Sequence, residues 1–287
     1  MRGGRYIAAL VALAAVAVVI VGYRNATADP LVRRLTVEVP DYPAGAPPVH
    51  ILLFSDLHVH GPDMPPARVE RIVRQINALH PDIIAAAGDF VGNHLFGRDY
   101  SIAESVAPLG RLRPRLGVVA VLGNNDYQAG GSEVAASLER LGIDVLVNRS
   151  VAIGPIAFGG FDGRVYPWRQ LMAARAATYG ALESTPGVKV LLSHRPDESA
   201  TAPGFVSIVL AGHTHCGQIV LPLFGPVWTG SDYGRRYFCG VIREGRRITV
   251  VTGGLGTSHI PLRIGAPPDM WLIEVRGPSG ASGKLAK

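Results

Sequence analysis

The stretch that decides the fold is ILLFSDLH, residues 51–58, in which four apolar residues run directly into a serine, a carboxylate and an imidazole. An apolar run of this length is typical of a strand that is buried on both faces. Side chains that follow such a strand lie at its carboxyl end, where open α/β sheets place their functional sites. Asp56 and His58 are therefore candidate site residues.

Four more short apolar runs each lead into a carboxylate, an amide or an imidazole. In chain order they are residues 83–87 before Gly88-Asp89, residues 118–122 before Gly123-Asn124-Asn125-Asp126, residues 188–192 before Ser193-His194, and residues 208–211 before Gly212-His213-Thr214-His215. Mixed Asp, Asn and His ligands suit Mn, Fe, Zn or Co, whereas calcium prefers a cage made only of oxygen. The sequence therefore predicts a metal site at one end of a sheet.

Helical patterns lie between these predicted strands. Apolar residues recur at helical spacing over residues 67–79, and two more helices are expected over residues 132–141 and 168–182. Strands that alternate with helices indicate an α/β sheet with layers packed on it. A short strand is also expected at residues 35–39, and the chain becomes rich in glycine and strand-like after Gly212. The Gly/Ser-rich tail, residues 277–287, is expected to be disordered.

The N-terminus carries an apolar segment, residues 7–21, that is flanked by arginines and by Tyr6 and Tyr23. With those tyrosines as interfacial anchors, it just reaches the length of a membrane span. Ala26-Thr27-Ala28 has the form of a signal-peptide cleavage site, so a cleaved leader is the alternative to a retained anchor. We favour the anchor, with residues 1–34 as anchor and linker and residues 35–276 as the catalytic domain.

Composition narrows the possible partners and the redox chemistry. The net charge of +6 suits a phosphate-bearing substrate or an anionic membrane surface. No basic stretch is interleaved with aromatic residues, so nucleic-acid binding is not expected. The two cysteines, Cys216 and Cys239, do not form a disulfide framework. Free thiols are expected, and a single bridge between the two cysteines stays open.

In their order along the chain, these motifs resemble those of the calcineurin-like metallophosphoesterases over about residues 35–275. Gly217-Gln218, Leu221-Pro222 and residues 253–257 are most similar to a membrane-anchored bacterial branch, which is itself similar to UDP-2,3-diacylglucosamine pyrophosphatases. The resemblance implies a four-layer α/β/β/α sandwich preceded by one transmembrane helix. It also implies a single-pass anchor in the bacterial cytoplasmic (inner) membrane, with the side of the catalytic domain left open.

The resemblance further implies two divalent metal ions held by seven side chains. The expected ligands are Asp56, His58 and His215 for one ion, Asn124, His194 and His213 for the other, and Asp89 as a bridge between them. Arg195, beside His194, is a candidate for binding substrate phosphate. Arg235, Arg236 and Arg263 are further candidates for that role.

Asn125 departs from the family pattern, because most members carry a histidine there that protonates the leaving oxygen and is oriented by the next residue, Asp126. Asparagine cannot act as a general acid. The change favours a leaving group that departs unaided, such as the phosphate of a pyrophosphate bond. His94, in Gly92-Asn93-His94, is a possible substitute donor.

The predicted function is thus metal-dependent hydrolysis of a phosphoanhydride or phosphodiester in a lipid-linked substrate such as UDP-2,3-diacylglucosamine. One alternative is a general phosphodiesterase that acts on nucleotides or phospholipid esters. Another is a non-catalytic metal-binding module. Because the changed residue, Asn125, is not one of the seven expected ligands, the catalytic readings are favoured over the last.

Overall fold

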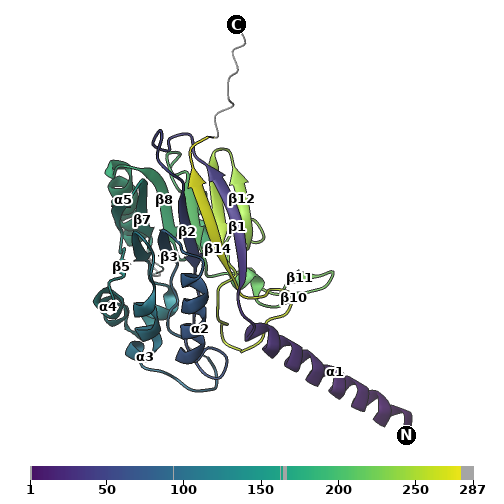
Figure 1. The fold of residues 1–287 in the computed structure, drawn as a ribbon. Helices are drawn as coiled ribbons and strands as arrows, with labels where there is room; N and C mark the ends of the chain where they lie inside the picture. Colours follow the sequence, from purple (N-terminus) through teal and green to yellow (C-terminus); the bar gives the residue numbers. More distant parts are fainter. Residues whose placement is uncertain (1, 93, 162, 164–166, 279–287) are drawn as a thin grey trace.

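Two six-stranded sheets packed face to face form the centre of the protein in the computed structural model, which describes residues 2–92, 94–161, 163 and 167–278 (Figure 1). The first sheet has the order β1 (Leu31–Glu38), β14 (Asp269–Arg276), β2 (Val49–Phe54), β3 (Ile83–Ala86), β4 (Gly117–Ala120), β5 (Asp144–Val145). The second has the order β12 (Gly240–Glu244), β13 (Arg247–Val251), β9 (Ile208–Ala211), β8 (Val188–Ser193), β7 (Ile156–Phe161), β6 (Arg149–Ile153). A small hairpin of β10 (Val220–Leu221) and β11 (Gly225–Pro226) stands apart from both sheets.

Helices cover the outer faces of both sheets. The first sheet carries α2 (Pro66–Asn77), α3 (Ile102–Val106) and α4 (Asn124–Arg140), and the second carries α5 (Trp168–Ser184). Three 3₁₀ turns lie at Ala107–Arg111, Pro196–Ala200 and His215–Gly217. The result is the expected four-layer α/β/β/α sandwich (Figure 1).

Strand β2 shows why the central strands are apolar throughout. Leu52 and Phe54 pack into the core beneath the helices, whereas Ile51 and Leu53 pack between the two sheets. Because successive side chains of a strand point to opposite faces, a strand covered on both faces has no polar side to present. The apolar run in the sequence is the direct consequence.

Most of the predicted elements are confirmed, with two differences in where they begin. Strand β1 starts at Leu31, four residues before the predicted strand, and pairs in parallel with β14. Helix α4 starts at Asn124, eight residues earlier than expected, and Gly130 interrupts it with a φ of 116°. The part after Gly130 corresponds to the predicted helix. Of the tail expected to be disordered, residues 279–287 lie outside the described residues.

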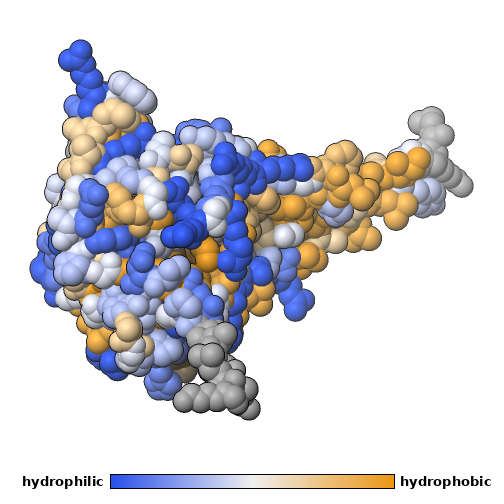
Figure 2. Space-filling view, turned by 90° about the horizontal axis from the view of Figure 1, so that it is seen from above, coloured by the Kyte–Doolittle hydropathy of each residue, from blue (hydrophilic) through white to orange (hydrophobic). Residues whose placement is uncertain are grey.

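Helix α1 (Arg2–Ala26) projects from the sandwich, and residues Gly4–Ala26 are long and apolar enough to cross a membrane. Figure 2 shows it as a largely hydrophobic protrusion from a more polar body. Its last turn is joined to the folded domain, since the Gly22 carbonyl accepts a hydrogen bond from the Arg263 amide at 2.9 Å. The Ala28 carbonyl accepts another from Arg68 at 2.8 Å. Cleavage after Ala28 would remove both contacts.

Candidate metal centre

The loops after five strands bring the predicted ligands together at one end of the sandwich. Two groups of three side chains have ligand atoms within 4.8 Å of one another, all buried or partly buried. The first group is Asp56, His58 and His215, and the second is Asp89, His194 and His213. These groups match six of the seven expected ligands.

In the first group, two imidazoles and a carboxylate converge on one point. His58 Nε2 lies 3.1 Å from His215 Nε2, and Asp56 Oδ1 lies 3.7 and 3.5 Å from these two nitrogens. Asp56 Oδ1 is buried and has no hydrogen-bond partner among the residues that the structure describes. Ligands that each lie about 2.0–2.2 Å from a shared cation end up with such mutual spacings. The donor set and the unpartnered oxygen therefore fit a divalent ion.

The second group is arranged in the same way and includes Asn124, the seventh expected ligand. His194 Nε2 lies 3.1 Å from both His213 Nδ1 and Asn124 Oδ1. Asp89 Oδ2 lies 3.4 Å from His194 Nε2 and 3.5 Å from His58 Nε2. One oxygen of Asp89 is thus within reach of both groups, which is the position that a bridging carboxylate requires.

Five of the seven residues have left-handed backbone conformations, namely Asp56, His58, Asp89, His213 and His215, with φ between 44° and 68°. Such conformations cost non-glycine residues free energy and cluster at functional sites. Neighbouring glycines permit the crowding, since a Cβ on Gly123 would collide with the Asp89 carboxylate. The backbone conformations that point these side chains inward therefore reduce the local stability of the fold.

The carboxylates and imidazoles of the group set one another's protonation states. Burial would lower the pKa of His194, but Asp89 outweighs it and raises that pKa to about 9, so a metal ion would displace this proton. Burial would raise the pKa of Asp56, but the nearby His215 and His58 outweigh it and hold that pKa well below its usual range. Burial likewise opposes the lowered pKa of Asp89, which His194 and His58 bring about. Burial, with His194, lowers the pKa of His213 to about 3. Ionised carboxylates and a neutral imidazole are the forms that bind metal.

Asp126 connects two of the ligand loops. Its carboxylate accepts the backbone N–H groups of Asp89, Phe90 and Gly123 at 2.8, 2.8 and 2.9 Å. Asn125 donates its side-chain amide to Asp89 Oδ2 at 2.6 Å and its backbone N–H to Asp89 Oδ1 at 2.8 Å. Both residues that were predicted to be catalytic therefore contact Asp89 or its loop directly.

The arginines predicted to hold phosphate are already engaged. Arg195 pairs with Asp197 at 3.1 Å and with Asp232 at 3.0 Å, so a phosphate would compete with two carboxylates for its guanidinium. Arg235 donates to the Phe224 carbonyl, and Arg236 pairs with Glu244.

His94, predicted as a possible proton donor, lies in a neighbouring loop. Its Nε2 is 2.9 Å from Thr257 Oγ1, and its ring stacks on His60 with 4.5 Å between centroids. His60, which has no motif around it, is buried.

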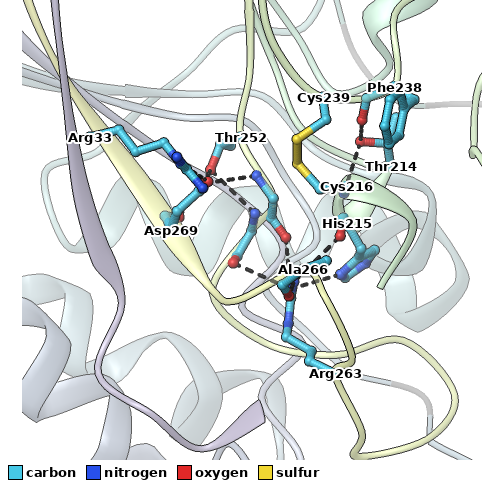
Figure 3. Close-up of a disulfide and its surroundings, with 12 residues drawn as sticks. Arg33, Thr214, His215, Cys216, Phe238, Cys239, Thr252, Arg263, Ala266 and Asp269 are labelled. Atoms are coloured by element: carbon cyan, nitrogen blue, oxygen red, sulfur yellow. Dashed lines mark hydrogen bonds and ion pairs between the residues drawn. A yellow bond between two sulfur atoms is a disulfide. The ribbon is translucent and has the colours of Figure 1, made fainter. Parts of the chain in front are cut away.

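The prediction that Arg263 binds phosphate is wrong, because its side chain is fully buried. Its guanidinium lies next to the His215 ring (Figure 3). There Nη2 donates to the Gly253 carbonyl at 2.7 Å and Nη1 to the Ala266 carbonyl at 3.0 Å. Nη2 also lies 3.2 Å from His215 Nδ1. Arg263 is therefore a positioning residue that fixes the loop around His215, a predicted metal ligand, a role for which the sequence offers no local motif.

A disulfide joins Cys216 to Cys239 (Figure 3), so the expectation of free thiols is wrong. Their Cα atoms lie 4.8 Å apart although 23 positions separate them in the chain. Cys216 directly follows His215, and Thr214 donates from Oγ1 to the Phe238 carbonyl at 2.6 Å. The bridge thus ties the turn that carries two of the predicted ligands to the segment before β12.

We expect the Cys216→Ala/Cys239→Ala variant to lose about 3 kcal/mol of unfolding free energy, the entropic contribution of closing a loop of this length. Metal affinity should fall too, because the His215 turn is released. Thermal unfolding with and without added Mn²⁺ would measure both effects. Wild type treated with a reductant should behave like the variant, and an unchanged melting temperature in both would contradict the prediction.

The sequence matches the profile of the calcineurin-like phosphoesterases over residues 49–217. It is 31% identical over 250 residues to an uncharacterized metallophosphoesterase of Aquifex aeolicus, an alignment that covers 86% of this chain and 92% of that protein. It is also 31% identical over 273 residues to a transmembrane protein with a metallophosphoesterase domain from Danio rerio, covering 89% of this chain. The chain spans 59% of the length of the Danio rerio protein. A solved archaeal phosphodiesterase is 16% identical, with a TM-score of 0.39 and coverage of 71% of this chain and 84% of that one.

Proposed function

The chain belongs to the calcineurin-like phosphoesterases, which are metal-dependent phosphoesterases, and on this premise we propose that it hydrolyses phosphodiester or phosphoanhydride bonds whose leaving group departs without a proton donor. Divalent ions bound at such a centre activate water and neutralise charge on phosphate. The seven residues predicted as ligands would hold two ions, with Asp89 between them. Their identity as Mn, Fe, Zn or Co is open.

Asn125 carries the proposal about the leaving group. Its side chain is almost fully buried and donates to Asp89 Oδ2, so it supports the orientation of the predicted bridging carboxylate. An amide has no proton to transfer near neutral pH, and general acid catalysis is typically worth about 10²–10⁴-fold. Substrates that need a protonated leaving oxygen should therefore be turned over poorly.

The disulfide favours one side of the membrane. Disulfides persist in oxidising compartments and are rare in the cytoplasm. We therefore infer that α1 anchors the chain with its catalytic domain outside the cytoplasm. UDP-2,3-diacylglucosamine, as a nucleotide-linked precursor, would be met on the cytoplasmic face and so fits this arrangement less well than a lipid-linked phosphoanhydride outside the cytoplasm does.

A leaving-group series tests the proposal. With Mn²⁺ present, we expect wild type to hydrolyse bis-p-nitrophenyl phosphate and UDP-2,3-diacylglucosamine far faster than alkyl phosphomonoesters. Asn125→His should raise the rate for poor leaving groups by up to about 10²-fold, because it restores a proton donor beside Asp126. Steady-state turnover over this series is the measurement.

Asn125→Ala is the matched control, since it removes the contact to Asp89 without adding a donor. Its rates should fall for all substrates alike. Normal turnover of alkyl phosphomonoesters by the wild type would contradict the proposal. Hydrolysis confined to bis-p-nitrophenyl phosphate would instead favour the general phosphodiesterase with an undetermined natural diester.

A further inference from the structure

Helix α1 and the metal centre lie at the same end of the sandwich. Strand β1 begins at Leu31, just after α1 ends at Ala26. It runs parallel to β14, and β14 runs antiparallel to β2, so the carboxyl end of β2 lies at the end where α1 joins. Strands β3 and β4 run parallel to β2. The ligands that follow these three strands therefore emerge on the side of α1 (Figure 1).

The last turn of α1 is fixed to the loops that surround the metal centre. The Gly22 carbonyl accepts from the amide of Arg263, whose side chain supports His215. The Tyr23 hydroxyl lies 3.4 Å from the Pro62 carbonyl, in the loop that follows His58. A tyrosine at the end of a membrane span marks the level of the lipid–water interface. These contacts hold the interfacial end of α1 against the loops of the site, so the loops lie at the surface of the bilayer.

An apolar rim surrounds this end of the domain. It consists of the exposed residues Leu95, Phe96, Leu221, Leu223, Phe224, Val227 and Trp228. The β10–β11 part of the rim is tied to α1, since Ile219 bridges to Ile264, next to Arg263, and accepts a hydrogen bond from the Val227 amide. Figure 1 shows this hairpin beside the domain end of α1. Apolar groups gathered in this way typically mark a protein or membrane contact.

A pocket of about 260 Å³ connects the rim to the ligands. Its lining includes Ile219, Val227, Trp228 and Ile260 together with the metal-ligand candidate His215. The Trp228 ring also lies edge-on to His213, with 6.0 Å between centroids. A lipid tail in this pocket would leave a phosphate attached to it within reach of the predicted metal centre.

We propose that the apolar rim enters the bilayer that α1 spans, and that the pocket beside His215 takes an acyl chain of a membrane lipid. The bond hydrolysed in that lipid is a phosphoanhydride, or a phosphodiester whose leaving group departs unprotonated. The assignment of substrate rests on the function proposed above, whereas the insertion of the rim does not. The rim contacts the same membrane that holds α1, because the fixed end of α1 places the rim at the surface of that membrane.

Depth measurement tests the rim. The full chain would be reconstituted in nanodiscs of phosphatidylcholine and phosphatidylglycerol, with a nitroxide at Leu223→Cys or, as control, at Leu116→Cys. Leu116 is a partly exposed apolar residue just before β4, at the opposite end of the sandwich. We expect dissolved oxygen to relax the nitroxide at position 223 as strongly as it relaxes a nitroxide in hydrocarbon. The nitroxide at position 116 should be relaxed only as strongly as one in water. Water at both positions would overturn the insertion of the rim.

Chain length tests the pocket. Methyl and dodecyl p-nitrophenyl phosphodiesters would be compared in the same nanodiscs, and wild type should have a KM at least roughly tenfold lower for the dodecyl diester, since each buried methylene contributes about fourfold in binding. Ile260→Asp should abolish this preference, whereas Leu116→Asp should keep it. Equal KM values in wild type would overturn the acyl-chain assignment and leave the proposed hydrolysis intact. Failure to hydrolyse either diester would contradict the proposed function, and the label at Leu223 would still decide the rim.

Discussion

Asp89→Ala should abolish hydrolysis of bis-p-nitrophenyl phosphate, with a loss well beyond the roughly 10–100-fold that removal of a supporting residue around a metal costs. The reason is the place of Asp89 Oδ2 between both ligand groups, 3.5 Å from His58 Nε2 and 3.4 Å from His194 Nε2. Its loss would leave the buried imidazoles without the carboxylate that attracts cations. Turnover with Mn²⁺ and metal content after dialysis are the two measurements.

Asp82→Ala is the matched control, because Asp82 precedes β3 whereas Asp89 follows it. Asp82 bonds the His50 amide and Arg115, so its removal should affect stability and leave metal content near that of wild type. A variant lacking Asp89 that still binds two equivalents of metal and hydrolyses the diester would show that the bridging assignment is wrong.

The convergence of the seven predicted ligands could be anticipated because each of them follows an apolar strand. A buried strand fixes where its last residue lies, and parallel neighbours place their ends together, so local patterns such as Gly212-His213-Thr214-His215 carry information about a distant partner. The alternation of strands and helices gave an α/β sheet with layers packed on it, and the resemblance to the family gave the four-layer α/β/β/α sandwich. Substrate and membrane orientation have no such local signature, since they depend on how α1 meets the domain.

Strand β7 was missed because glycine obscures it. Strand β7 reads IAFGGF, and Gly159 and Gly160 suggest a turn. In the fold, a Cβ on Gly160 would collide with Leu146, and one on Gly159 would lie 3.0 Å from Leu182. These glycines allow a loop and α5 to pack close to the strand, and this packing can be seen only in the folded structure. Helix α4 was predicted to begin too late for a related reason, since Gly130 breaks its pattern near the start.

The disulfide and the role of Arg263 could not be predicted, because both depend on contacts between segments far apart in the chain. Cys216 and Cys239 meet through the fold of the segment between them. Nothing in the residues beside Arg263 distinguishes it from an exposed arginine such as Arg236, which pairs with Glu244 at the surface. Burial alone distinguishes Arg263, which supports the site, from an arginine that is solvated at the surface.

That difference in burial predicts the second large effect. Arg263→Met keeps much of the side-chain volume but leaves the Gly253 and Ala266 carbonyls, among others, without their donor. Each buried unsatisfied group costs about 1–3 kcal/mol, so we expect a loss of about 3–5 kcal/mol in unfolding free energy. Metal affinity should also fall by roughly 10–100-fold, because His215 loses the guanidinium behind it. Thermal unfolding and metal titration measure the two effects.

Arg236→Met is the control for Arg263→Met, since it removes an arginine from the surface and should change neither quantity measurably. Arg263→Lys separates charge from geometry. A lysine keeps the positive charge but cannot span carbonyls on both sides of the loop with a rigid fork, so it should be destabilised nearly as much as the methionine variant. If Arg263→Lys melts like wild type, the charge behind His215 matters more than the fork. If Arg263→Met also does, the guanidinium does not support the site, and the disulfide at Cys216 is left as the main support of the His215 turn.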